Sequence, residues 1–326
     1  MISGFHIAFR YLPLALGLVF AACERPQEAR PAEPHGRLRA EDSHAEAAHG
    51  CSTRDEDAAL AAINAARSDA RQPAFSCLAK LSAMATAHAA FLASNENLSL
   101  ASAHREQPGA PGYTGNTLGE RAAYQGLDVA HFWLAEGAGG GAEAKDVVAA
   151  HLATVYHRSP LLAPGGRYFA FALGRGQNPH AVMNMLLWVT TDGLGTARWP
   201  APGARGVAPN FNASGEKPEP RADPSRAGYP VSVHFPRYIN DDGSEPAVAV
   251  DEFTLRDSRG SSVGAKVLSS TNDGEVYPSD AFLLPEDALT PGETYVVRAR
   301  MTYGDLALDE EWEFTTLVGD GVLQVP

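Results

Sequence analysis

Long hydrophobic runs are missing from the interior of this 326-residue sequence. No stretch beyond the N-terminal segment offers the roughly 20 apolar residues that a membrane-spanning helix needs, so we expect no internal membrane helix. Basic residues are also scarce, since 26 Lys and Arg stand against 39 Asp and Glu and give a net charge of −13. An acidic chain is repelled by phosphate backbones, and we therefore expect no nucleic-acid partner.

Several motifs of well-known enzymes are absent as well. The chain has no His-Glu-x-x-His segment, which removes the usual support for a zinc peptidase of that type. The glycine-rich residues 137–141 lack the Lys-Ser/Thr of a phosphate-binding loop and the spacing of a dinucleotide fingerprint. We interpret this segment as a flexible connection. The sequence leaves open whether the protein is an enzyme.

The features that are present begin with a predicted signal peptide at residues 1–22. Arg10 precedes a short apolar run that ends in small residues, which is typical of a secretory signal. Cys23 follows two alanines directly and resembles the lipidated cysteine of a bacterial lipobox, although Phe20 stands where Leu is usual. We expect an exported protein that is anchored to a membrane through lipid on Cys23. An ordinary cleaved signal is the alternative.

Two further cysteines follow a tether at residues 23–51, which is rich in Pro, Glu, Ala and Arg and has no hydrophobic periodicity. Cys51 and Cys77 can form a disulfide, because such bonds form and persist in exported proteins. The bond would close a loop over residues 52–76 and contribute about 3 kcal/mol to stability. Two free buried thiols are the alternative.

The tether is followed by a pattern of helices and buried strands. Ser52 or Thr53 can cap the first helix, and the acidic residues that follow favour the positive end of its dipole. Apolar positions recur at helical spacing in further segments, and two continuous apolar runs suit strands of a covered sheet. We expect helices at residues 77–92, 119–126 and 143–157, and strands at residues 132–136, 168–173 and 182–189.

Three polar side chains within this pattern could carry chemistry. His104 lies in a long loop, Glu136 lies at the end of a predicted strand, and His157 lies in the last turn of a predicted helix. Folding could bring the two imidazoles and the carboxylate together in a cleft. For His157 the alternative is a cation that interacts favourably with the C-terminal end of its helix.

The order and spacing of these segments resemble the bacterial form of the CAP family, which includes cysteine-rich secretory proteins, antigen 5 and plant pathogenesis-related proteins. The resemblance covers residues 52–195 and implies an α-β-α sandwich over residues 52–197, hence an α+β fold. It depends on the helices Leu60–Arg67 and Leu78–Ala89, on His104, on Glu136 in Ala-Glu-Gly where the family commonly has Gly-Glu-Asn, and on His157-Arg158.

The resemblance also implies a site. In the family two histidines and two acidic residues line a cleft, with which zinc or magnesium has been associated in some members. His104, Glu136 and His157 match three of these positions, whereas the fourth falls near Thr154, which has no carboxylate. Two imidazoles and one carboxylate are a ligand set that suits zinc. Our hypothesis is therefore a zinc or magnesium site at these three residues.

A second domain is predicted after residues 198–228, which contain six prolines and which we interpret as a linker. Residues 229–318 alternate between apolar and polar positions in short segments such as 231–235, separated by turn residues. This pattern is typical of an all-β sandwich. Leu289–Tyr295 and Trp312–Thr316 resemble segments of bacterial Ig-like domains.

Together these features predict an exported surface protein, either a cell-envelope lipoprotein or a secreted one, with a binding or interaction role. Members of the CAP family include lipid and sterol binders, so the resemblance implies a lipid, sterol or cell-envelope ligand. The alternative function is a metal-assisted hydrolase that acts on peptide or cell-envelope substrates. In a third interpretation the histidines of the cleft only stabilise the fold.

Overall fold

A computed structural model of the chain describes residues 51–96, 103–130, 132–177, 179–211, 216–221, 226–240 and 242–318. The predicted signal peptide, the lipidation site Cys23 and the tether up to residue 50 lie outside the described residues. Within these ranges, no helix has the length and the apolar character needed to cross a membrane.

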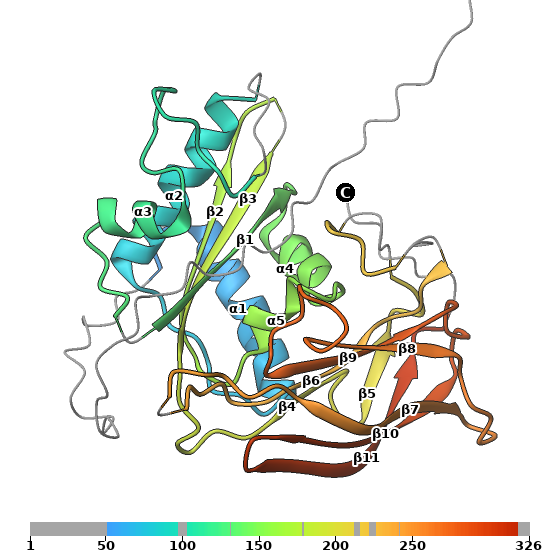
Figure 1. Ribbon diagram of the computed structural model, residues 1–326. Coiled ribbons are helices and arrows are strands. Elements are labelled where there is room, and N and C mark those ends of the chain that lie inside the picture. The colour runs from blue at the N-terminus through green and yellow to red at the C-terminus, as the bar shows by residue number, and fades with distance from the viewer. Residues whose placement is uncertain are drawn as a thin grey trace, which may run out of the picture.

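The N-terminal half of the described chain consists of helices on both faces of a small antiparallel sheet (Figure 1). The sheet has the order β1-β3-β2, with β1 at Phe132–Gly140, β2 at Gly166–Gly174 and β3 at His180–Trp188. One face packs on α1 (Arg54–Asp69), α4 (Ala144–Leu152) and α5 (Arg158–Leu162). The other face packs on α2 (Ala79–Ser94) and α3 (Leu118–Tyr124). This layering agrees with the predicted α+β class and α-β-α arrangement.

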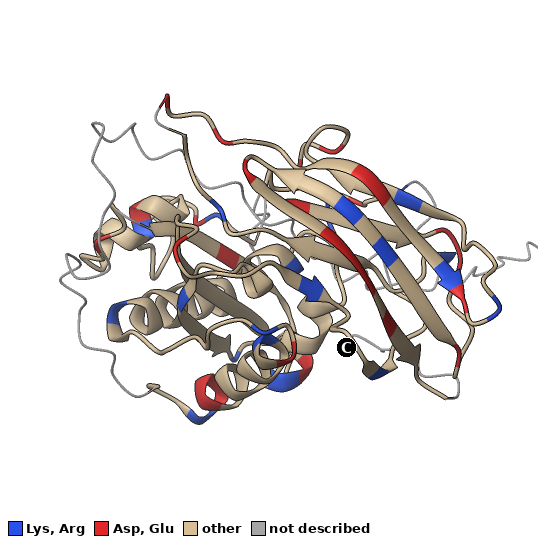
Figure 2. Cartoon of the chain, turned by 90° about the horizontal axis from the view of Figure 1, so that it is seen from below, with Lys and Arg blue, Asp and Glu red and all other residues tan. Residues whose placement is uncertain are grey.

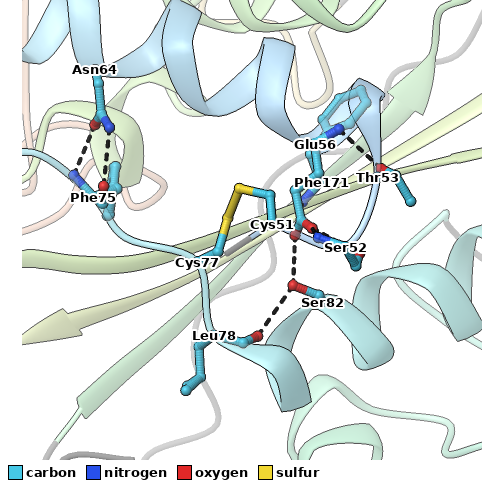
Figure 3. Close-up of a disulfide and its surroundings, with 10 residues drawn as sticks. All are labelled: Cys51, Ser52, Thr53, Glu56, Asn64, Phe75, Cys77, Leu78, Ser82 and Phe171. Atoms are coloured by element: carbon cyan, nitrogen blue, oxygen red, sulfur yellow. Dashed lines mark hydrogen bonds between the residues drawn. A yellow bond between two sulfur atoms is a disulfide. The ribbon is translucent and has the colours of Figure 1, made fainter. Parts of the chain in front are cut away.

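The start of α1 is fixed by a helix cap and by a disulfide. The hydroxyl of Thr53 accepts a hydrogen bond from the backbone N–H of Glu56 at 3.1 Å, as the sequence predicts. The disulfide between Cys51 and Cys77 is confirmed, and it joins the entry of α1 to the entry of α2 (Figure 3). The buried carboxylate of Glu56 lies beside it and accepts a hydrogen bond from the Ser82 hydroxyl at 2.6 Å.

The prediction of a flexible connection at residues 137–141 was wrong, because residues 137–140 form the second half of β1. They continue the antiparallel pairing with β3 as far as Gly140 opposite His180. A Cβ on Gly137 would lie 3.2 Å from Met183 Cε and 3.3 Å from His151 Cδ2. An alanine here would require the Met183 or His151 side chain to shift by a few tenths of an ångström, so glycine favours the close approach of α4 to the sheet.

The helix predicted at residues 143–157 is shorter than expected. Helix α4 ends at Leu152, residues 153–157 form a turn, and His157 is the N-cap of α5 rather than part of the last turn of α4. The Thr154 hydroxyl donates to the carbonyl oxygen of His151 at 2.6 Å. The backbone N–H groups of residues 155–157 donate to the carboxylate of Glu216 and do not continue the helix.

The C-terminal half consists of two four-stranded sheets that share one hydrophobic core (Figure 1). Val233 and Leu283 of one sheet contribute to the same core as Phe253 and Val297 of the other, so this region is a β-sandwich. Its Ig-like character stays a prediction. One sheet has the order β5 (Ala204–Val207), β11 (Leu306–Thr316), β10 (Thr294–Tyr303), β7 (Ala249–Asp257), and the other has the order β4 (Ala197–Trp199), β6 (Val231–His234), β9 (Asp280–Pro285), β8 (Ala265–Ser269).

The linker predicted at residues 198–228 needs correction, because part of it belongs to the sandwich. Strand β4 pairs with β6, and β5 runs parallel to β11. These strands contain three and four residues, which is too short for an alternating pattern to be visible among the surrounding prolines. The sandwich therefore begins near Ala197 and not at residue 229.

Charged residues recur along the strands of the sheet formed by β5, β11, β10 and β7 (Figure 2). Arg298 on β10 forms ion pairs with Asp309 on β11 and, at 3.8 Å, with Glu252 on β7. Exposed pairs of this kind usually contribute less than about 1 kcal/mol each. They keep the outer face polar, whereas the shared core provides the stability of the sandwich.

The two halves of the chain are joined by buried contacts. The Arg158 guanidinium donates to the carbonyl oxygen of Pro230 at 2.7 Å and to the Ser232 hydroxyl at 3.1 Å. Trp133 of β1 packs edge-on against Tyr277 with ring centroids 4.4 Å apart. The start of α5 and strand β1 are thus two of the places where the helical half and the sandwich meet.

Candidate functional site

Glu136 lies at the centre of a buried polar network between the sheet and the α2/α3 layer. Its Oε1 accepts hydrogen bonds from Arg121 Nη2 at 2.7 Å and from His104 Nδ1 at 3.0 Å. Its Oε2 accepts from Asn184 Nδ2 at 2.9 Å. Asn184 is opposite Glu136 in the β1–β3 pairing. The side chains of His104, Arg121 and Glu136 are each at most 1% exposed.

Arg121 connects the loop that carries His104 to the sheet. It lies on α3, where Thr117 and Glu120 form a capping box that fixes the start of the helix. Its Nη1 donates to the backbone oxygen of His104 at 3.0 Å while its Nη2 contacts Glu136. A single guanidinium therefore positions both predicted site residues.

A second histidine–carboxylate pair adjoins this network. His88 Nδ1 lies 2.9 Å from Glu106 Oε1, and His88 Nε2 lies 3.8 Å from Glu136 Oε1. Glu106 also accepts hydrogen bonds from the backbone N–H groups of Thr114 at 2.5 Å and Gly115 at 3.2 Å. His88 is thus a fully buried residue of α2 whose two ring nitrogens both have hydrogen-bond partners.

The network stabilises the ionised form of its carboxylates. Burial alone would raise the pKa of Glu136, but the charges of Arg121 and His88 and the hydrogen bond from His104 outweigh it and hold that pKa far below its usual range. For Glu106, burial opposes the hydrogen bonds from His88 and Thr114, and the net shift of its pKa is again downward.

His157 belongs to a different cluster. Its Nδ1 lies 3.2 Å from Glu216 Oε1, and its ring is 4.9 Å from the ring of His151 in an edge-on arrangement. His151 packs near Gly137, the neighbour of Glu136 in β1. Since adjacent strand residues point to opposite faces, His151 lies on the α1/α4 face and Glu136 on the α2/α3 face. The structure therefore brings His104 to Glu136, and it pairs His157 with His151 and Glu216.

The arrangement does not fit the zinc or magnesium site of our hypothesis. His104, Glu136 and His157 do not form a group with ligand atoms within 4.8 Å of one another, the spacing that a shared metal ion needs. Both oxygens of Glu136 already accept strong hydrogen bonds, one of them from a guanidinium cation. Among the described residues, Cys51, Glu56 and Cys77 meet the spacing, but their two sulfurs are bonded to each other.

The predicted site residues are also deeply buried. His104 and Glu136 are each 1% exposed and His157 is 2% exposed, which is far less than residues that line an open cleft. A ligand would have to displace protein contacts to reach these side chains. The geometry supports a hydrogen-bonded network that organises the fold and orders the surrounding loops.

His151, which packs against His157, is also buried, and the pH dependence of stability tests whether its imidazole is neutral in the folded protein. Burial, followed by the charges of His157 and His104, lowers the pKa of His151 to about 3. The unfolded chain takes up a proton near pH 6.5, so stability is complete above that pH and is lost as the pH falls from 6.5 towards 3.

We expect the free energy of unfolding to fall by up to about 1.4 kcal/mol for each pH unit below 6.5. The His151→Gln variant should lose most of this slope, because its side chain takes up no proton. His180→Gln is the matched control, since the pKa of the half-buried His180 is also lowered but Glu96 opposes the shift. Urea unfolding between pH 7 and 5, above the range where carboxylates titrate, measures the slope. An equal slope in wild type and His151→Gln would contradict a buried neutral His151.

Several residues of the two clusters were missed by sequence reasoning. Arg121 lies in a predicted helix and Asn184 in a predicted strand, and a charged or amide side chain on an otherwise buried element is a signal that could have identified them. Glu106 lies two residues after His104 in the sequence but received no role. Glu216 had no such signal, because it lies among the prolines of the predicted linker.

The Gly-x-Ser-x-Gly pattern of serine hydrolases occurs once, in the sandwich. Residues 260–264 read Gly-Ser-Ser-Val-Gly, but they connect β7 to β8, whereas a nucleophile elbow joins a strand to a helix. A cavity of about 490 Å³ lies beside this connection and is lined by Asp257, Arg259 and Glu286 among others. Ser262, the serine of the motif, is not among the lining residues. The motif therefore gives no support for a serine nucleophile.

Comparison with known proteins supports the CAP resemblance. Residues 60–189 match the family model described as CAP, the cysteine-rich secretory protein family. This region contains the three-layer fold and the Glu136 network. The match supports a CAP-domain protein with a binding role that is not specified further. No curated protein matches the chain.

Proposed function

We propose that the chain is an exported, lipid-anchored CAP-domain surface protein that binds a ligand and does not hydrolyse one. Export is supported by the signal-like residues 1–22 and by the disulfide between Cys51 and Cys77, since disulfides persist mainly in oxidising compartments. Lipid anchoring is supported by the position of Cys23 directly after two alanines.

We favour binding over hydrolysis because both carboxylate oxygens of Glu136 already accept hydrogen bonds from protein side chains. A metal-assisted hydrolase needs a ligand set with an open position for water. Glu136 instead accepts hydrogen bonds from Arg121, His104 and Asn184 and is 1% exposed. The Arg121 guanidinium already neutralises its charge, so we assign the Glu136 carboxylate a role in stabilising the fold. The ligand would then bind to other, surface residues of the CAP region.

The proposed ligand is a lipid, a sterol or a component of the cell envelope. Lipid on Cys23 would hold the chain at a membrane, where such ligands are concentrated. The tether would then space the CAP region from that surface. The sandwich, which packs on the CAP region through Arg158 and Tyr277, would be presented together with it.

Fractionation of bacterial cells that express the full chain tests the anchor. We expect the wild-type protein in the membrane fraction and labelled by a palmitate analogue, and the Cys23→Ser variant unlabelled and released. Phe20→Leu is the matched control, because it brings the lipobox closer to the usual sequence and should keep or increase labelling. Wild-type protein that is unlabelled and soluble would refute lipid anchoring, and wild-type protein that stays in the cytoplasm would refute export.

A further inference from the structure

Glu216 makes unusually many contacts for a residue in a proline-rich connecting segment. Its Oε1 accepts hydrogen bonds from the backbone N–H groups of Tyr156 at 2.6 Å and His157 at 3.3 Å, and its Oε2 accepts from that of Val155 at 2.9 Å. Its Oε1 also lies 3.2 Å from His157 Nδ1. Three consecutive backbone donors and an imidazole thus surround one carboxylate.

This carboxylate is completely buried, since Glu216 is 0% exposed. A buried charge is tolerated only when hydrogen bonds and opposite charges replace the lost water. The three N–H groups supply the hydrogen bonds, and the neighbouring Arg158 guanidinium, which is itself fully buried, supplies positive charge. The three N–H groups, the His157 imidazole and the nearby guanidinium therefore provide an environment that suits a carboxylate anion.

Residues 155–158 also contact the sandwich. The Tyr156 hydroxyl donates to Asp273 Oδ2 at 2.8 Å, and Arg158 donates to the backbone oxygen of Pro230. Glu216 lies outside the region that matches the CAP model, whereas Val155, Tyr156 and His157 lie inside it. The carboxylate therefore reaches His157 only because the connecting segment packs against the CAP region.

We propose that residues 155–157 and the His157 imidazole form a carboxylate-binding pocket, and that Glu216 is the internal carboxylate that occupies it. Glu216 is a positioning residue. Its oxygen beside Nδ1 holds a proton on that nitrogen and fixes the orientation of the His157 ring against His151. The pocket is assembled from the CAP region and the connecting segment together, and a small external carboxylate fits it once the Glu216 side chain is removed.

The test uses the full chain labelled with ¹⁵N-histidine, with acetate as the probe. In Glu216→Ala we expect the ¹⁵N signals of His157 to shift and the melting temperature to fall. Acetate at 100 mM should return the His157 signals towards their wild-type positions and raise the melting temperature, whereas chloride at equal ionic strength should not. In Glu216→Gln, which keeps the shape and loses the charge, the His157 signals should shift while the fold is retained.

Glu106→Ala is the matched control, because Glu106 also combines a histidine with backbone N–H donors but contacts His88. Acetate should leave the His157 signals of this variant unchanged. His157 signals that are identical in wild type, Glu216→Ala and Glu216→Gln would overturn the proposal. A Glu216→Ala protein that responds equally to acetate and chloride would overturn the carboxylate pocket. Neither result depends on export or on an external ligand, so the proposed function is tested separately.

Discussion

Replacing Arg121 with methionine is expected to lower the free energy of unfolding by about 3–5 kcal/mol, because it leaves the Glu136 carboxylate buried without its guanidinium partner. The pair is 2.7 Å apart and almost fully buried, so water cannot replace the lost contact without opening the fold. The same change also removes the donor to the backbone oxygen of His104. Urea unfolding of the full chain at pH 7 measures the loss.

A surface variant and a double variant separate the buried charge from other effects of the substitution. Arg175→Met removes an arginine whose side chain is 76% exposed and pairs with Asp55, and it should cost less than about 1 kcal/mol. Arg121→Met combined with Glu136→Gln should be more stable than Arg121→Met alone by at least about 1 kcal/mol, because no unpaired charge remains. A loss below 1 kcal/mol for Arg121→Met would show that the network is not essential to the fold.

Removing the disulfide is expected to have the next largest effect. Cys51 and Cys77 are separated by 26 positions, and opening a loop of this length costs about 3 kcal/mol by the chain-entropy account. The bond also holds the start of α1 near Ser82 of α2, to which Glu56 is hydrogen bonded (Figure 3). The double variant Cys51→Ser/Cys77→Ser should therefore unfold at lower urea concentration.

The control for this prediction is Cys23→Ser, which leaves the bridge intact. Its unfolding midpoint should equal that of the wild type, and adding a reductant should lower both midpoints to that of the Cys51→Ser/Cys77→Ser variant. Midpoints that are unchanged by the reductant would contradict a stabilising role for the bond.

The sequence predicted most helices and strands of the CAP region well, because each depends on local signals, and the resemblance to the CAP family implied how they are layered. The Thr53 cap and the helical spacing of Leu60 and Ile63 mark α1, and the long apolar runs mark β2 and β3. The second half of β1 was missed, because glycines carry no apolar pattern and their place in the sheet depends on the pairing with β3. Tertiary packing decided the structure there.

The site was predictable only in part, for a similar reason. The resemblance to the CAP family implied that His104 and Glu136 lie together, and the structure shows their contact. The position of His157 depends on where α4 ends, and that end depends on Glu216, which is about 60 residues away in the sequence. No local pattern encodes a contact at that distance. The same holds for β4 and β5, which are strands because they pair with β6 and β11.

Zinc titration calorimetry on the full chain tests most directly whether the His104–Glu136 network is a charge-compensated hydrogen-bond network and not a metal centre. The wild-type protein should be compared with His104→Ala and His157→Ala variants that circular dichroism shows to be folded. We predict that the three proteins give the same titration, so that any zinc they take up binds elsewhere. One equivalent of zinc bound by the wild type and lost in both variants would contradict the account and would favour the metal-assisted hydrolase.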